Sequence, residues 1–218
     1  MNRRDFAATL ALPAIASGSL LGAASAYAQG NAPKEGKEYI ALSKPAPIDA
    51  PQGQIEVVEF FWYNCPHCNA FEPRLEAWVK NLPKDVAFRR APVAFRSDFE
   101  PQQRLYFVLE ALGLIDTLHA KVFYAIHVER KNLATKDAIA DWIATQNVDK
   151  AKFLATYDSF SVVSKARRAA QLQDAYQVEG VPSIGIGGRF YTDGQLTGSM
   201  ERVLQTTDYL VAELRKGR

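Results

Sequence analysis

The stretch that decides the fold is Glu59-Phe60-Phe61-Trp62-Tyr63-Asn64-Cys65-Pro66-His67-Cys68. An apolar, aromatic-rich run from Ile55 to Tyr63 predicts a buried β-strand. The only two cysteines among the 218 residues follow it, with the spacing C-x-x-C. An amphipathic helix then begins with Pro66 in its first turn, where a missing N–H costs nothing. The sequence therefore predicts a strand, a cysteine pair and a helix in direct succession.

This succession places one sulfur at the N-terminus of a helix, where backbone N–H groups are unpaired and the helix dipole is positive. Both features stabilise a thiolate, so we expect Cys65 to be acidic and Cys68, one turn further on, to be shielded. His67 lies between the two sulfurs, and its imidazole or the neighbouring N–H groups can stabilise the Cys65 thiolate. Because a stabilised reduced form makes the disulfide a strong oxidant, the pattern predicts redox chemistry.

Two other uses of a cysteine pair fit the sequence less well. A structural zinc ion needs four ligands, but besides the pair the chain offers only His67, His119 and His127. The last two lie in a separate helical pattern, where we expect surface or packing positions. A structural disulfide closing so short a ring removes little chain entropy and would lie at a reactive helix terminus. We therefore expect no metal and no cofactor besides the Cys65–Cys68 disulfide.

Residues 1–28 have the pattern of a cleavable export signal. Arg3 and Arg4 form a basic start, a mildly apolar core follows, and small residues end in Ala26-Tyr27-Ala28. The apolar core is too short and too weak for a permanent membrane anchor. The two arginines suit the general secretory route and also resemble the twin-arginine type of signal. We expect export to an oxidising compartment, where a cysteine pair is a disulfide for part of the time.

The remaining chain carries almost no net charge. Without residues 1–28, the 26 basic and 24 acidic residues fall to 24 and 23, so the net charge falls from +2 to +1. A net charge this close to zero does not indicate a protein that binds nucleic acid or an anionic membrane. About 190 residues remain, enough for one sizeable core or for a core with an insertion.

The elements after residue 28 divide into three stretches. Residues 29–97 predict a short strand near Tyr39, the strand and helix around the cysteines, and a strand over residues 86–90 that completes a right-handed β–α–β unit. Residues 98–173 show helical periodicity alone. Residues 174–218 predict a strand entered through a proline, a hairpin turn and a closing amphipathic helix. The glycines of the turn precede no helix, so we reject a nucleotide site.

This order of elements resembles the α/β thioredoxin-like fold with an inserted α-helical domain. The resemblance implies a first thioredoxin-like part over residues 29–97, a helical domain over residues 98–173 and a second thioredoxin-like part over residues 174–218. Within this superfamily, Cys65-Pro66-His67-Cys68 preceded by Glu59 resembles the DsbA family of bacterial periplasmic dithiol oxidases. Gly180-Val181-Pro182 and the helical insertion strengthen the resemblance, which covers residues 37–218 in element order.

The resemblance implies roles for residues outside the cysteine motif. Pro182 would be cis and face the disulfide, and it would present the backbone of Val181 to an extended substrate peptide. Glu59 is an odd residue in an apolar strand, since buried carboxylates are rare unless they are paired or functional. In the family, an acid here lies beneath the disulfide and helps move the proton of the buried thiol. Its basic partner would be Arg90, or Arg89 in another strand register.

The resemblance also implies a function and partners. The chain would oxidise reduced, unfolded exported proteins in the periplasm, work as a monomer, and be reoxidised by DsbB, a quinone-linked membrane protein. Two alternatives stay open: a disulfide isomerase or reductase of the same fold, and a peptide-binding chaperone module whose cysteines are incidental. Isomerases of the superfamily usually add a dimerisation domain and carry threonine where this chain has Val181.

Overall fold

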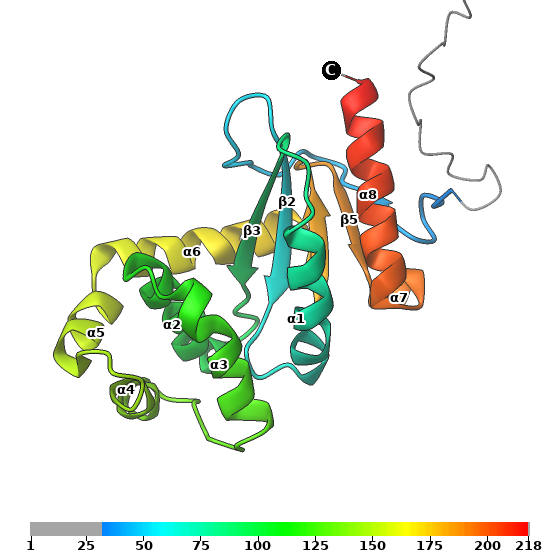
Figure 1. The fold of residues 1–218 in the computed structure, drawn as a ribbon. Coiled ribbons are helices and arrows are strands. Elements are labelled where there is room, and N and C mark those ends of the chain that lie inside the picture. Colours follow the sequence, from blue (N-terminus) through cyan, green and yellow to red (C-terminus); the bar gives the residue numbers. More distant parts are fainter. Residues whose placement is uncertain (1–31, 218) are drawn as a thin grey trace, which may run out of the picture. The chain divides into compact units, whose positions relative to one another are not determined.

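A five-stranded mixed sheet runs through the structure, in the order β1-β5-β4-β2-β3 (Figure 1). A computed structural model describes residues 32–217, so the predicted export signal and its cleavage site lie outside the described residues. Strands β2 and β3 are parallel, and the other neighbouring pairs are antiparallel. The strands are β1 (Ile40–Ala41), β2 (Ile55–Phe61), β3 (Val86–Pro92), β4 (Ser183–Ile186) and β5 (Phe190–Asp193).

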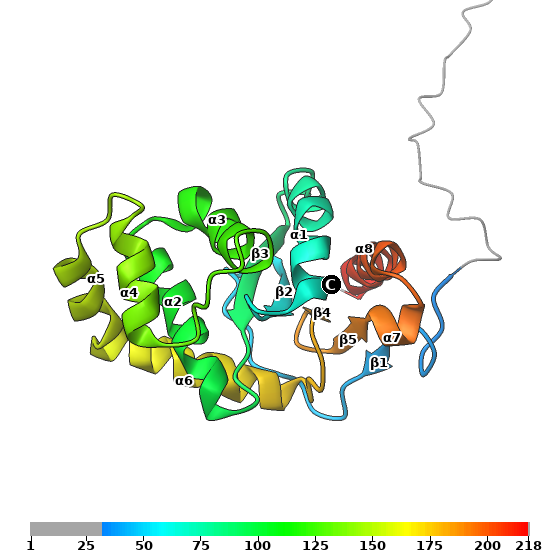
Figure 2. The same ribbon diagram turned by 90° about the horizontal axis from the view of Figure 1, so that it is seen from below.

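Helices cover both faces of the sheet. Helices α1 (Pro66–Val79) and α8 (Met200–Lys216) lie on one face, and α6 (Phe160–Ala175) lies on the other, as Figure 2 shows from below. Because successive side chains of a strand point to opposite faces, Val57 of β2 packs with the core under α1 and α8, whereas Val58 packs with the core under α6. Strand β2 is therefore buried on both sides, which explains its nearly continuous apolar run.

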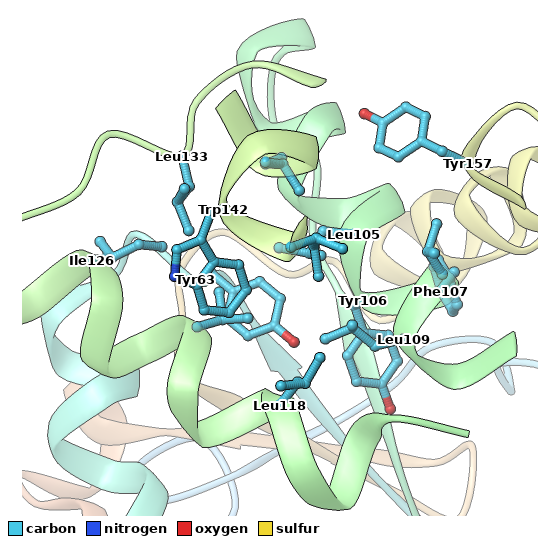
Figure 3. Packing of buried hydrophobic residues seen from close by; sticks show 14 of the residues in the cluster. Tyr63, Leu105, Tyr106, Phe107, Leu109, Leu118, Ile126, Leu133, Trp142 and Tyr157 are labelled. Atoms are coloured by element: carbon cyan, nitrogen blue, oxygen red, sulfur yellow. The ribbon is translucent and has the colours of Figure 1, made fainter. Parts of the chain in front are cut away.

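The chain between β3 and β4 is helical, as its periodicity predicts. A single 3₁₀ turn (η1, Ser97–Phe99) precedes α2 (Glu100–Ala111), α3 (Ile115–His127), α4 (Lys136–Ala144), α5 (Lys150–Tyr157) and α6. These helices enclose an apolar core of their own, seen from close by in Figure 3, to which Tyr63 also belongs. Both cysteines border this core. The dithiol therefore lies where the helical insertion meets the thioredoxin-like part.

The predicted fold class is confirmed, with differences at the ends of elements. Strand β2 ends at Phe61, two residues before the apolar run ends, and Trp62 and Tyr63 belong to the turn that leads into α1. A short helix, α7 (Gly194–Thr197), was not predicted. The described residues from Pro33 onward form one compact unit, and α6 continues past residue 173, so the domain boundaries at residues 97 and 173 stay predictions.

The hairpin between β4 and β5 confirms the turn predicted at two glycines. Gly187 and Gly188 have φ values of 58° and 67°, a left-handed conformation that glycine adopts without steric cost.

None of the helices between residues 32 and 217 has the length and apolar character needed to cross a membrane.

Candidate active site

The two cysteines occupy the first turn of α1 as predicted. Cys65 is the N-cap residue and Pro66 the first helical residue. The backbone N–H of Cys68 donates to the Sγ of Cys65 at 3.3 Å, so the sulfur accepts one of the hydrogen bonds that a helix N-terminus offers. Both thiols are free, and Cys65 keeps 7% of its surface exposed whereas Cys68 keeps none. Only Cys65 is therefore open to attack by a sulfur from outside.

The environment separates the acidities of the two thiols. A hydrogen bond from the Cys68 thiol is the largest influence on the pKa of Cys65; it outweighs burial and, with N–H groups of Cys68 and His67, lowers that pKa to about 6. Burial, followed by the hydrogen bond with Cys65, raises the pKa of Cys68 well above its usual range. Cys65 is therefore the thiol that ionises, and Cys68 holds its proton.

His67 lies on the surface beside the pair. The charge on its imidazole also lowers the pKa of Cys65, but less than the hydrogen bond from Cys68 and less than the backbone N–H groups do. The sequence pointed to either the imidazole or the nearby N–H groups as the stabilising feature. In the structure, the N–H groups and the buried Cys68 thiol lower the pKa of Cys65 more than the imidazole does.

The loop before β4 brings a distant backbone segment to the cysteines. The Val181–Pro182 peptide bond is cis, as the resemblance implied. The Sγ–H of Cys65 donates to the carbonyl oxygen of Val181 across 3.4 Å, although 116 residues separate the two in the chain. The predicted site residues Cys65, Val181 and Pro182 therefore meet at one place, with the backbone of Val181 next to the reactive sulfur.

Beneath the cysteines, Arg90 joins three carboxylates. Glu59 and Arg90 are direct neighbours in the parallel register of β2 and β3, and the Nε–H of Arg90 donates to Glu59 at 3.0 Å. The Nη2 group of the same guanidinium donates to Glu72 at 2.6 Å and to Glu76 at 2.7 Å. Arg89, the alternative partner, pairs with Glu56 instead. The pairing of Glu59 with Arg90 is thus the one present.

Glu59 and Glu72 have opposite proton affinities in this cluster. Burial, followed by the charge of Glu72, raises the pKa of Glu59 to about 8 even though Arg90 opposes both effects. Burial also acts on Glu72, but the His119 imidazole, whose Nε2 lies 3.2 Å away, and the charge of Arg90 outweigh it and lower the pKa of Glu72. Glu59 therefore holds a proton at neutral pH while Glu72 is ionised. A charge on Glu59 is also among the causes that raise the pKa of Cys68.

Several polar residues of this region were not predicted from the sequence. Glu72 lies between Phe71 and Leu75 on the buried face of α1, and a carboxylate within such an apolar stripe is a signal that the sequence does carry. His119 was expected at a surface or packing position, and it is buried; in addition, its Nδ1 is 2.8 Å from the hydroxyl of Tyr63 and its Nε2 is 3.2 Å from Glu72. Nothing in its helical spacing indicates those partners. Among residues 32–217, no three His, Cys, Asp or Glu side chains are grouped so as to hold a metal ion.

Comparisons with known proteins agree with this geometry. Residues 56–205 match the family model described as a DSBA-like thioredoxin domain. The chain is 43% identical over 217 residues to the thiol:disulfide interchange protein DsbA of Bordetella parapertussis, covering 99% of this chain and 100% of the relative. The crystal structure of Pseudomonas aeruginosa DsbA superposes with a TM-score of 0.79 at 44% identity, covering 84% of this chain and 94% of that one. DsbA from Xylella fastidiosa gives 0.79 at 32% identity, with 85% and 100% covered.

Replacing Cys68 tests what makes Cys65 acidic. Cys68→Ser keeps a side-chain donor to the Cys65 sulfur, whereas Cys68→Ala removes it. Since a hydrogen bond to a charged group is worth about 1.5–3 kcal/mol, the pKa of Cys65 should be about 1–2 units higher in the alanine variant than in the serine variant. A pH titration of thiolate absorbance in both variants measures this difference. Equal midpoints would show that the side chain of residue 68 plays no part.

Replacing Glu59 tests its raised pKa through the pH dependence of stability. Between the unfolded pKa near 4.5 and the folded value of about 8, the native protein binds a proton that the unfolded chain does not. This group therefore makes the free energy of unfolding fall as pH rises, by up to about 1.4 kcal/mol per pH unit. Glu59→Gln does not titrate, so its stability relative to the parent should grow between pH 5 and 8. Denaturant unfolding of both reduced proteins measures this, and parallel pH curves would contradict it.

Proposed function

This chain belongs to the family of DsbA-like thioredoxin domains, and from this premise we propose that it oxidises newly exported proteins in the periplasm by donating its Cys65–Cys68 disulfide. Its relatives are thiol:disulfide interchange proteins, and it is a protein thiol:disulfide oxidoreductase. The observation that carries the direction of the reaction is the contrast between the two thiols. Cys65 is acidic and accessible, whereas Cys68 is protonated and buried.

The proposed reaction is two successive thiol–disulfide exchanges. A substrate thiolate attacks the Sγ of Cys65, the Cys65–Cys68 bond breaks, and the Cys68 sulfur leaves and takes up a proton. A second substrate thiolate then attacks the substrate sulfur of the mixed disulfide, and Cys65 leaves as a thiolate. The substrate loses two electrons and gains a disulfide, while the chain becomes a dithiol. The acidity of Cys65 favours its departure in the second step.

The surrounding residues support these steps in the proposed scheme. The backbone of Val181, held beside the sulfur by the turn at Pro182, would align an extended substrate segment next to Cys65. Glu59, with its proton and its partner Arg90, would receive or supply the proton of the buried Cys68 thiol. Pro66 begins the helix whose N–H groups face the Cys65 sulfur, and His67 adds a positive charge when it is protonated.

The reduced chain must then lose two electrons to a second partner. We propose a quinone-linked membrane oxidase of the DsbB type, with the chain acting as a monomer without a bound cofactor. The export signal predicted for residues 1–28 would place it in the same compartment as this partner and its substrates.

Oxidation of a reduced, unfolded protein with a single native disulfide tests this function. With the oxidised parent, the substrate disulfide should form in stoichiometric amounts, whereas Cys65→Ser should give none because the remaining Cys68 is buried and has no disulfide to donate. Cys68→Ser cannot form the internal disulfide, so by itself it should oxidise no substrate, but once its Cys65 carries a mixed disulfide with a small thiol it should deliver one substrate disulfide and release that thiol. Thiol counting and non-reducing electrophoresis measure these products.

Two further assays, of disulfide isomerisation and of substrate aggregation, separate the two alternatives. An isomerase would act on scrambled disulfides when it is reduced and would oxidise dithiols poorly when it is oxidised. A chaperone module would keep its effect on substrate aggregation after Cys65→Ser. Either of these outcomes would replace the oxidase proposal.

A further inference from the structure

Two histidines of α3 hold Tyr63, which lies two residues before Cys65. The hydroxyl of Tyr63 is 2.8 Å from the Nδ1 of His119. The Nε2–H of His127, two turns further along the same helix, donates to the backbone carbonyl of Tyr63 at 2.8 Å. The helical insertion therefore contacts the turn that leads to the reactive cysteine through both ends of one residue.

His119 reaches further than His127, because its second nitrogen meets the carboxylate cluster. Its Nε2 lies 3.2 Å from the Oε1 of Glu72, the same oxygen that accepts from Arg90. Four aromatic rings surround the imidazole, with ring centroids 5.2–5.9 Å away, and they fix its orientation. His127 stacks on the ring of Phe123 instead.

The neighbours of His119 determine which of its nitrogens carries the proton. Glu72 is ionised beside Arg90, so a lone pair on Nε2 would face a negative oxygen. A proton on Nε2 turns this repulsion into attraction, and Nδ1 then accepts from the hydroxyl of Tyr63. Burial lowers the pKa of His119, which keeps the imidazole neutral at physiological pH. The tautomer is therefore fixed from both sides.

The cluster that His119 joins has more acids than cations. Three carboxylates face one guanidinium, and the Oε1 of Glu59, the Oε2 of Glu72 and the Nε2 of His119 have no aligned hydrogen-bond partner among residues 32–217, so Nε2 acts on the Oε1 of Glu72 electrostatically across 3.2 Å. The titratable and charged groups around His119 come from β2, the following turn, α1, β3 and α2: they are Glu59, Tyr63, Glu72, Glu76, Arg90 and Tyr106. An N–H of His119 beside Glu72 therefore favours the ionised form of Glu72 and leaves Glu59 as the carboxyl that holds a proton.

We propose that His119 is a positioning residue for the dithiol reaction: its Nε2–H keeps Glu72 ionised, and this leaves the proton of the cluster on Glu59, beneath Cys68. The link through Tyr63 fixes the tautomer that makes this donation. The proposal rests on the proposed function, because it assigns the helical insertion a part in placing the proton that the Cys68 sulfur exchanges.

Titration of the side-chain carboxyl carbons by NMR, in the reduced full-length protein, tests this placement. His119→Phe keeps the ring but removes the donor, so the midpoint of Glu72 should rise by about one pH unit, a tenfold change in proton affinity, and that of Glu59 should fall. His119→Gln keeps one donor and one acceptor and should restore the parent midpoints. His127→Gln is the matched control, since it alters the other contact of α3 with Tyr63 without touching the carboxylates.

Unchanged midpoints of Glu59 and Glu72 in folded His119→Phe would overturn the proposal. If that variant does not fold, Tyr63→Phe decides. The nitrogen shifts of His119 should report the Nε2–H tautomer in the parent and a mixture in Tyr63→Phe, and an Nδ1–H tautomer in the parent would overturn the proposal. These readouts do not depend on substrate oxidation. If the midpoints shift while the parent fails to oxidise substrate, the proposed function is wrong but the proton placement stands.

Discussion

The site depends on one hydrogen-bonded sulfur at the start of a helix. The Sγ of Cys65 accepts from the backbone N–H of Cys68 at 3.3 Å and from the thiol of the same residue, and these donors stabilise its negative charge. A strand that is buried on both faces delivers Cys65 to this point, and Pro66 starts the helix that supplies the N–H groups. Cys68 is itself buried, and its backbone N–H and its thiol both donate to the Cys65 sulfur. The two thiols therefore have different pKa values although only three positions separate them in the chain.

The rest of the fold surrounds this pair from three directions. The Val181–Pro182 turn places a backbone carbonyl 3.4 Å from the Cys65 sulfur. Near Cys68, Arg90 holds three carboxylates, and burial together with the charge of Glu72 raises the pKa of Glu59. From the third side, α3 reaches Tyr63 through two histidines. The helical insertion is thus in contact with the turn and the charges next to the dithiol, as well as forming a core of its own.

Much of this arrangement could be predicted from the sequence because it depends on local patterns. The strand, the C-x-x-C spacing and Pro66 define the helix start, and the β–α–β unit makes β2 and β3 parallel. The sequence did not decide between Arg90 and Arg89, because the register that pairs Glu59 with Arg90 is visible only in the structure. The partners of His119 could not be predicted, because they depend on how α3 packs against α1, and helical periodicity shows only which residues are buried. The dominant effect of the Cys68 thiol on Cys65 also needed coordinates, since it depends on the orientation of a side chain.

The reduction potential of the Cys65–Cys68 pair, measured by equilibration with glutathione at pH 7, shows whether the acidic Cys65 thiol makes this pair an oxidant. Lowering the pKa of Cys65 from 9.0 to about 6 stabilises the reduced form at pH 7 by about 1.4 kcal/mol, which is about 30 mV for a two-electron couple. We therefore predict a potential less negative than the value of about −270 mV for thioredoxin. A potential equal to or more negative than that of thioredoxin would contradict the account.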